Sequence, residues 1–274
     1  MQDAAHITRQ AKSNLAFALK ILPAKKRRDM QVFYAFCRIA DDLADAPGLD
    51  PQARAAGFQS WLDGLNHGFA SPTPLQSQLV ELRDRLQIPN DWLTDILLGC
   101  QSDLAPQRFE TWEELDLYIR RVACAVGWVS VRVFGCQSPA AHSYATALAR
   151  ALQLTNILRD IREDLENGGR IYLPIEDLER FGYHEDDLHN RVADGRFLML
   201  MKFEADRAME FFDRAERLLP QSDRKALRPA KIMAAIYRHL LTKMSQDGFR
   251  VFKKRYRVSS IRKSVLLAKH LIAG

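Results

Sequence analysis

The chain has 274 residues, of which 47% are hydrophobic and 27% charged, and its formal net charge is +6 at pH 7. No Gly/Ser/Pro-rich linker, low-complexity tract or solenoid-length repeat divides it, so we expect a single domain over residues 1–274. The sequence has no apolar signal segment and no run of about 18 apolar residues, which excludes a membrane-spanning helix. We therefore predict a cytoplasmic protein, with peripheral association at the inner membrane face left open.

Helical spacing of apolar residues covers nearly the whole chain, and no run alternates apolar and polar residues as a half-buried strand does. The first predicted helix ends at about Leu22, because Pro23 cannot continue it. A second begins near Arg27 and ends in aspartates near Pro47. Further helices are predicted at roughly 51–67, 74–87, 90–103, 111–135, 139–167, 191–218, 222–247 and 259–272. The sequence thus indicates an all-α fold.

Two of these predicted helices are apolar almost all round, in the stretches YIRRVACAVGWVSVRVFG and HSYATALARALQLTNILRDI. Such helices are expected at the centre of a bundle, where other helices surround them. Small residues such as Ala123, Ala125 and Gly127 allow close helix approach, or they leave room for a long apolar ligand. Tight packing is the simpler interpretation of the segment taken alone.

The cysteines argue against a zinc site, and the basic residues favour an anionic partner. The four cysteines lie far apart without zinc-site spacing, so we interpret them as reduced, packed thiols: Cys37, Cys100, Cys124 and Cys136. Basic residues concentrate at Lys25–Arg28 and from Arg250 to Lys263. A basic surface favours nucleic acid, anionic lipid headgroups or phosphorylated small molecules, and charge alone does not choose among them.

Two acidic clusters carry the strongest functional signal. Positions i, i+4 and i+8 share one face of a helix, as do Asn156, Asp160 and Asp164, and a second cluster contains Asp41, Asp42 and Asp45. Stacked carboxylates repel one another, and a cation held between them removes that penalty. Two such helices facing each other would form a polynuclear Mg²⁺ site for a diphosphate.

Burial sharpens this prediction for the upstream cluster. It follows the apolar stretch VFYAFCRIA without a break, so we expect its helix to be at least half buried where the carboxylates begin. Buried carboxylates require a partner, and a divalent cation satisfies several at once. The competing interpretation is a solvated helix end with surface acids.

Arginines accompany both clusters. Arg38 precedes Asp41 by three residues, Arg159 directly precedes Asp160, and Arg170 follows two glycines. Guanidinium groups bind phosphate oxygens through two hydrogen bonds, which fits a Mg²⁺-diphosphate better than a bare cation. Each arginine is also placed to neutralise a neighbouring aspartate.

Together these segments resemble the squalene/phytoene synthase family of head-to-head prenyl transferases. The matching stretches are ILPAKKRRDMQVFYAFCRIADDLAD, YIRRVACAVG, LARALQLTNILRDIREDLENGGRIYLP, IMAAIYRHLL and GFRVFKKRYRVS, in order over most of the chain. The resemblance implies an all-α isoprenoid-synthase (terpenoid synthase) bundle with a central apolar cavity and two aspartate-rich helices that hold Mg²⁺.

The resemblance also implies roles for individual residues. Asp41 and Asp45 match the first aspartate motif and Asp160 and Asp164 the second, and these four are expected to be catalytic together with Tyr118. Matches to polar, substrate-binding positions are Lys12, Arg38, Gln153, Asn156, Arg159, Arg170, Tyr237, Lys254 and Arg255. The chain departs from the family pattern at Cys124, where relatives often have glycine.

The expected reaction joins two prenyl diphosphates, with two farnesyl diphosphates giving presqualene diphosphate and then squalene or a related C30 product. Condensation of two geranylgeranyl diphosphates to C40 phytoene is the alternative. NADPH is a possible cofactor for a reductive second step, although no GxGxxG fingerprint is present. Two other classes compete: a basic helical nucleic-acid-binding protein, which leaves the aspartates without a purpose, and a lipid-binding scaffold whose basic tail docks on a membrane.

Overall fold

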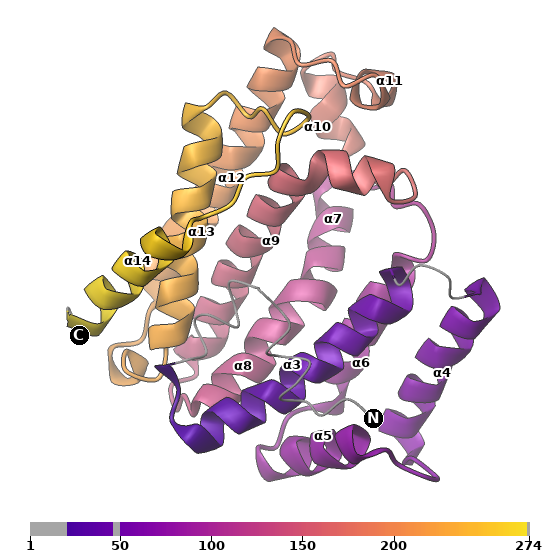
Figure 1. The fold of residues 1–274 in the computed structure, drawn as a ribbon, viewed down its shortest axis with the longest axis vertical. Helices are drawn as coiled ribbons and strands as arrows, with labels where there is room; N and C mark the ends of the chain where they lie inside the picture. The colour runs from indigo at the N-terminus through magenta and orange to yellow at the C-terminus, as the bar shows by residue number, and fades with distance from the viewer. Residues whose placement is uncertain (1–20, 46–49, 273–274) are drawn as a thin grey trace.

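The computed structural model describes residues 21–45 and 50–272, with side chains to residue 267, and every regular element in this part of the chain is helical (Figure 1). The prediction of an all-α fold is confirmed. The longer helices are α3 (Ala24–Asp45), α4 (Pro51–His67), α5 (Pro74–Arg85), α6 (Asn90–Ser102), α7 (Trp112–Ile119), α8 (Ala125–Phe134), α9 (Ala140–Glu166), α12 (Gly195–Leu218), α13 (Arg228–Gln246) and α14 (Ser260–Ile272). The first predicted helix and Lys12 lie outside the described residues.

Local signals explain where several helices begin. The Asp50 side chain accepts the backbone N–H groups of Gln52 and Ala53, and Pro51 occupies the first turn of α4. At α5, Thr73 and Gln76 form a reciprocal capping box. These ends agree with the predicted boundaries because caps and prolines act within one turn of the chain.

The predicted helix at 111–135 is confirmed as helical from Trp112 to Phe134, but it is not a regular α-helix throughout. Between α7 and α8 the chain forms a π-helical turn, Arg120–Cys124. Here α6 packs closely, and a Cβ added to Gly99 would lie 2.6 Å from Val122 Cγ1. The wider turn therefore accommodates a tight helix contact that leaves no trace in the local sequence.

Two other boundaries also differ from the predictions. Helix α12 begins four residues late, with the Asp194 side chain accepting the N–H groups of Arg196 and Phe197. Helix α13 begins at Arg228, after a short 3₁₀ turn, Gln221–Asp223. The segment before α12 contains two short helices that we did not predict, α10 (Ile175–Arg180) and α11 (Glu185–His189).

Helix α9 is the central element of the bundle. It packs most extensively on α12 and also contacts α8, α13 and the π turn, and Figure 1 shows it running through the middle of the molecule. At the contact with α8, a Cβ on Gly127 would lie 3.3 Å from the carbonyl oxygen of Ala145. The expectation of a central, nearly all-apolar helix is confirmed, since twelve of its residues are buried.

The exit from α9 positions two residues that matter below. Gly168 and Gly169 have φ values of 80° and 68°, a left-handed conformation that glycine adopts without steric cost. The chain turns back so that the Arg170 N–H donates to the carbonyl of Asp164 at 3.0 Å. Ile171 then hydrogen-bonds the carbonyl of Gln107 at 3.2 Å, which draws this loop onto the segment after α6.

Two general expectations can be checked against the described residues. Their four cysteines are free, with Cys100 and Cys124 buried, as predicted for packed thiols. Within residues 21–45 and 50–272, no helix is both long enough and apolar enough to cross a membrane.

Candidate active site

The last turns of α3 carry the first acidic row, Asp41, Asp42 and Asp45. Asp42 pairs with Arg38 at 2.6 Å, and the side chains of both are about half exposed. Asp41 and Asp45 are also exposed, which corrects the expectation that burial forces a partner on them. The reason is geometric: Phe33, Phe36 and Ala40 point into the core, and the carboxylates leave the helix on other sides.

Asp41 nevertheless lies among many protein atoms. Loss of surrounding water raises its pKa to about 6; the charge of Arg38 opposes this shift, and Asp45 and Asp42 add to it. The thiol of Cys100 donates to Asp41 Oδ1 at 3.8 Å. The carboxyl group therefore sits in a concave part of the surface that still admits solvent.

The second row lies on the last turns of α9 and is more enclosed. The side chain of Asp160 is 15% exposed and accepts from Arg159 Nε at 2.8 Å and from Arg255 Nε at 3.0 Å. Asp164 has no hydrogen bond or ion pair to its carboxylate within the described part of the chain. Burial raises its pKa to about 8, Asp160 adds to the shift, and Arg170 opposes it.

One guanidinium group connects the two rows. Arg170 Nη2 donates to Asp45 Oδ1 at 2.7 Å and to the backbone carbonyl of Asp103 at 2.8 Å. Its positive charge also acts on Asp164, where it opposes the rise in pKa that burial causes. Arg170 thus connects Asp45 of the α3 row with the surroundings of Asp164 in the α9 row.

A partly buried acid that we did not predict, Asp103, lies beside this arginine. Asp103 Oδ2 accepts the hydroxyl of Tyr118 and Oδ1 accepts the hydroxyl of Tyr172, both at 2.9 Å. Burial raises the pKa of Asp103, whereas the two phenols and Arg170 oppose that rise. The rings of Tyr118 and Tyr172 lie 5.3 Å apart, with Phe109 beside both. Tyr118 is therefore fixed by an aspartate that belongs to neither acidic row.

An apolar cavity of about 250 Å³ opens between α8, α9 and α13. Its apolar walls include Val126, Gly127, Leu148, Leu152 and Met233. Polar lining residues also occur, among them Gln153, Asn156 and Tyr237, and Tyr237 hydrogen-bonds Arg159. Gln153 and Asn156 lie on the turns of α9 just before Asp160, so the acidic row and the cavity share this helix.

Two buried oxygens near the second row have no hydrogen-bond partner within the described residues, Asn156 Oδ1 and Glu163 Oε2. The Asn156 amide nitrogen makes only a long contact, 3.5 Å, to Gln153 Oε1. Unsatisfied oxygens and carboxyl groups with raised pKa values are the donor set that a hard cation such as Mg²⁺ would satisfy. Among residues 21–45 and 50–267, no three Asp, Glu, His or Cys side chains are close enough to hold one ion together.

Some predicted substrate-binding residues have other contacts. Arg255 contacts Asp160 of the α9 row, whereas Lys254 pairs with Asp247 at 2.6 Å and lies over the ring of Tyr256. Arg38 contacts Asp42, away from Arg170. The residues that sequence reasoning missed are Asp103, Tyr172 and Glu163. Of these, only Tyr172 had a signal, since it lies in the GRIYLP stretch that we quoted for the family.

Comparison with known proteins identifies the family. The family model for squalene/phytoene synthase matches residues 8–262. A 15-cis-phytoene synthase of Synechocystis is 37% identical over 97% of this chain and 84% of its own length. A presqualene diphosphate synthase of Sinorhizobium fredii is 33% identical, covering 95% of this chain and 93% of its own.

Solved structures agree. A squalene synthase from Alicyclobacillus acidocaldarius superimposes with a TM-score of 0.79 at 30% identity, covering 90% of this chain and 93% of that one. A dehydrosqualene synthase solved with a ligand gives 0.85 at 28% identity, with 98% and 94% coverage. The chain therefore belongs to the squalene/phytoene synthase family of prenyltransferases.

Proposed function

We propose that this protein catalyses the Mg²⁺-dependent head-to-head condensation of two prenyl diphosphates. The favoured substrates are two farnesyl diphosphates, which pass through presqualene diphosphate to squalene or a related C30 product and release diphosphate. One observation carries the proposal: Arg170 joins Asp45 of the first acidic row to the surroundings of Asp164 in the second, and α9 links that row to an apolar cavity.

The residues at the mouth of the cavity suit the first bond cleavage. The allylic C–O bond breaks and its electron pair leaves with the diphosphate, so the site must stabilise growing negative charge. Asp41, Asp45, Asn156, Asp160 and Asp164 would hold Mg²⁺, which when bound supplies positive charge to the departing group. Arg159, Arg170 and Arg255 add fixed guanidinium groups on the same side.

The cavity and Tyr118 suit the steps that follow. The carbocation must meet the double bond of the second substrate rather than water, and walls of Val, Leu, Ala and Met exclude water. Loss of a proton then gives the cyclopropylcarbinyl diphosphate. The hydroxyl of Tyr118 donates to Asp103, so this pair can hold or relay a proton, and the ring face can stabilise a cation.

Two relatives support the shorter substrate. The Sinorhizobium fredii relative is named a presqualene diphosphate synthase, and the Alicyclobacillus acidocaldarius structure is a squalene synthase. The C40 alternative, phytoene synthesis from two geranylgeranyl diphosphates, is favoured by a different observation, the name of the Synechocystis relative.

The test is an assay of purified protein with farnesyl or geranylgeranyl diphosphate and Mg²⁺. We expect diphosphate release and a C30 product by mass spectrometry. Parallel reactions with and without NADPH determine whether the product is reduced, since a role for NADPH stays a prediction from the family resemblance. Exclusive turnover of the C20 substrate would contradict the preference for C15.

A variant at the second row tests the site itself. Asp160→Asn keeps the shape of the side chain but removes the charge that Arg159 and Arg255 share, and we expect turnover to be abolished while helix content by circular dichroism is retained. The matched control is Asp213→Asn on α12, which also removes an aspartate paired with an arginine, here Arg238 at 2.6 Å. An active Asp160→Asn enzyme would exclude the proposed metal role of this residue.

A further inference from the structure

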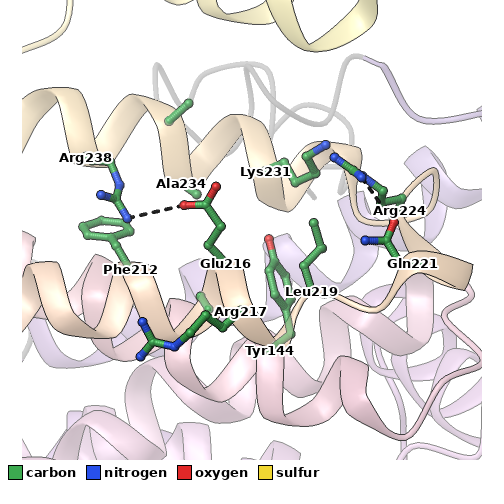
Figure 2. Close-up of a pocket in the computed structure, with 12 residues that line it drawn as sticks. Tyr144, Phe212, Glu216, Arg217, Leu219, Gln221, Arg224, Lys231, Ala234 and Arg238 are labelled. Carbon is green, nitrogen blue, oxygen red and sulfur yellow. Dashed lines mark hydrogen bonds and ion pairs between the residues drawn. The ribbon is translucent and has the colours of Figure 1, made fainter. Parts of the chain in front are cut away.

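A second cavity, of about 510 Å³, lies outside the candidate active site (Figure 2). It is a groove between the C-terminal end of α12 and the N-terminal half of α13, with Tyr144 of α9 at its base. Tyr144 lies 16 residues before Asp160, a separation of roughly 24 Å along an α-helix. The groove is therefore at the opposite end of α9 from the acidic rows.

The groove carries more positive charge than its carboxylate can balance. Its cationic side chains are Arg217, Arg224, Lys231 and Arg238, against a single carboxylate, Glu216, which lies 4.0 Å from Arg238. Arg238 pairs more closely with Asp213, and Arg224 bonds the side-chain oxygen of Gln221 at 3.2 Å. Arg217 and Lys231 have neither a hydrogen bond nor an ion pair with the described part of the chain.

The lysine also shows the effect of its neighbours. Burial lowers the pKa of Lys231, and the charges of Arg224 and Arg228 lower it further. A negative group bound between these cations would remove their mutual repulsion. This part of the groove is thus complementary to an anion.

Tyr144 links the groove to the apolar cavity, because it lines both. The residue is 3% exposed, and its hydroxyl has no hydrogen-bond partner within the described residues. Figure 2 shows the hydroxyl pointing between Glu216 and Lys231, next to Leu219. The groove therefore offers the Tyr144 hydroxyl as a hydrogen-bond donor beside unpaired cations. The same tyrosine separates the groove from the apolar cavity.

The remaining lining is apolar and includes Phe212, Ala215, Leu219, Ala234 and Ala235. A site with cations and apolar surface side by side fits an amphiphile with an anionic head, rather than a small inorganic ion. We propose that this groove binds the phosphate headgroup of an anionic membrane lipid. Docking there places the membrane beside the part of the apolar cavity that Tyr144 lines, and it does not depend on which prenyl chain the enzyme accepts.

The test compares binding to vesicles of pure phosphatidylcholine with vesicles that also contain phosphatidylglycerol, measured by flotation. Wild-type protein should bind only the anionic vesicles. Each cation near an anionic surface contributes a factor of about 5 in partitioning, so the double variant Arg217→Ala/Lys231→Ala should bind about 25-fold more weakly. Neither side chain has a partner to lose, so helix content by circular dichroism should not change.

The matched control, Lys202→Ala/Lys253→Ala, removes the same charge from exposed positions outside the groove, one of them in the C-terminal basic run. It should retain vesicle binding. Equal loss in both double variants would overturn the proposal in favour of a diffuse charge effect. Binding of inorganic phosphate at Arg217 and Lys231 without any vesicle binding would overturn it in favour of a soluble anion. Turnover of detergent-dispersed substrate by the groove variant should be normal, which separates this proposal from the proposed catalytic function.

Discussion

The two acidic rows of this bundle lie in different surroundings. On α3 the aspartates are exposed, and Asp42 and Asp45 each pair with an arginine. On α9 Asp160 is enclosed by two arginines, and Asp164 is enclosed without a hydrogen bond to its carboxylate within the described residues. A carboxylate in water costs little to leave unpaired, whereas an enclosed one requires a partner. The α9 row is therefore the one whose charge arrangement is incomplete without a ligand.

This difference suggests a division of roles. The α9 row is the more enclosed one, and its Asp164 carboxyl group has no hydrogen bond or ion pair within the described residues, so this row should dominate the affinity for a cation. The α3 row contacts Arg170 through Asp45, which is exposed to solvent. This row should therefore complete the site when substrate arrives. The predictions below test this division.

Among the variants that follow, the largest effect is expected at Asp164. Asp164→Asn removes the ligand that has no competing partner, and turnover should fall by about 10³-fold, the scale seen when one electrostatic contact to a transition state is lost. The metal-free variant should melt no lower than wild type, because repulsion from Asp160 is relieved. Steady-state kinetics and thermal unfolding measure the two effects, and a large loss of stability would show that the carboxylate is already compensated.

The next largest effect concerns the phenols on Asp103. If Tyr118 relays a proton, Tyr118→Phe should lower turnover by about 10²-fold. Tyr172→Phe removes an equivalent hydrogen bond from the same carboxylate and is the matched control. Each variant should lose about 1–3 kcal/mol of unfolding free energy, but Tyr172→Phe should affect turnover less. Equal loss of turnover in both would assign Tyr118 a positioning role only.

A buried acid outside both rows, Glu204, provides a reference for structural carboxylates. Glu204 is fully buried, 2.8 Å from Arg207, which Asp177 also contacts. Burial raises its pKa above the usual 4.5; Arg207 opposes the rise and Asp177 adds to it. The folded state then holds a proton that the unfolded state releases, so stability falls as pH rises from 4.5 toward the raised pKa.

Glu204→Gln should flatten that dependence, which amounts to at most about 1.4 kcal/mol per pH unit for one proton. Thermal unfolding across this pH range measures it. If the pH dependence of stability is the same in the variant, Arg207 keeps Glu204 charged in the folded protein. Burial alone would then not be what distinguishes the carboxyl groups of the α9 row.

The smallest effect is expected at Asp42. Its ion pair with Arg38 is half exposed on both sides, and exposed pairs contribute about 0.2–1 kcal/mol to stability. Asp42→Asn should change the unfolding free energy by about 0.5 kcal/mol and leave turnover close to wild type. Chemical denaturation and the condensation assay provide both values, and a severe loss of activity would give the α3 row a larger share than we assign to it.

The parts of the fold that the sequence predicted well depend on local chemistry. Helix α4 begins where Asp50 and Pro51 cap it, and α9 ends just before the glycines that reverse the chain. The placement of the two acidic rows followed from helical periodicity and from the family resemblance. These signals act within a few residues, so they can be read without knowing the packing.

The parts that were missed depend on distant contacts. Asp103 closes α6 without a distinctive motif, and its role arises only because Tyr118, Tyr172 and Arg170 reach it from other elements. The exposure of Asp41 and Asp45 was also missed. An apolar stretch indicates that a helix is buried, but it does not show which of the polar residues that follow are exposed to solvent. The cations of the basic groove around Lys231 come from α12, α13 and the turn between them, so no single stretch of sequence indicates that they lie together.

The π turn at Arg120–Cys124 has a consequence for how this scaffold can be altered. It inserts one residue into the hydrogen-bond ladder between Tyr118 and the cavity wall at Val122, Ala123 and Val126. The wider turn absorbs this residue, so Tyr118 and Val126 keep nearly the relative orientation that a regular helix one residue shorter would give them. Deleting one residue inside the turn should therefore restore a regular helix with the wall still on the side of the phenol. Deleting a residue from the regular part of α8 should instead rotate the rest of that helix by about 100° relative to Tyr118.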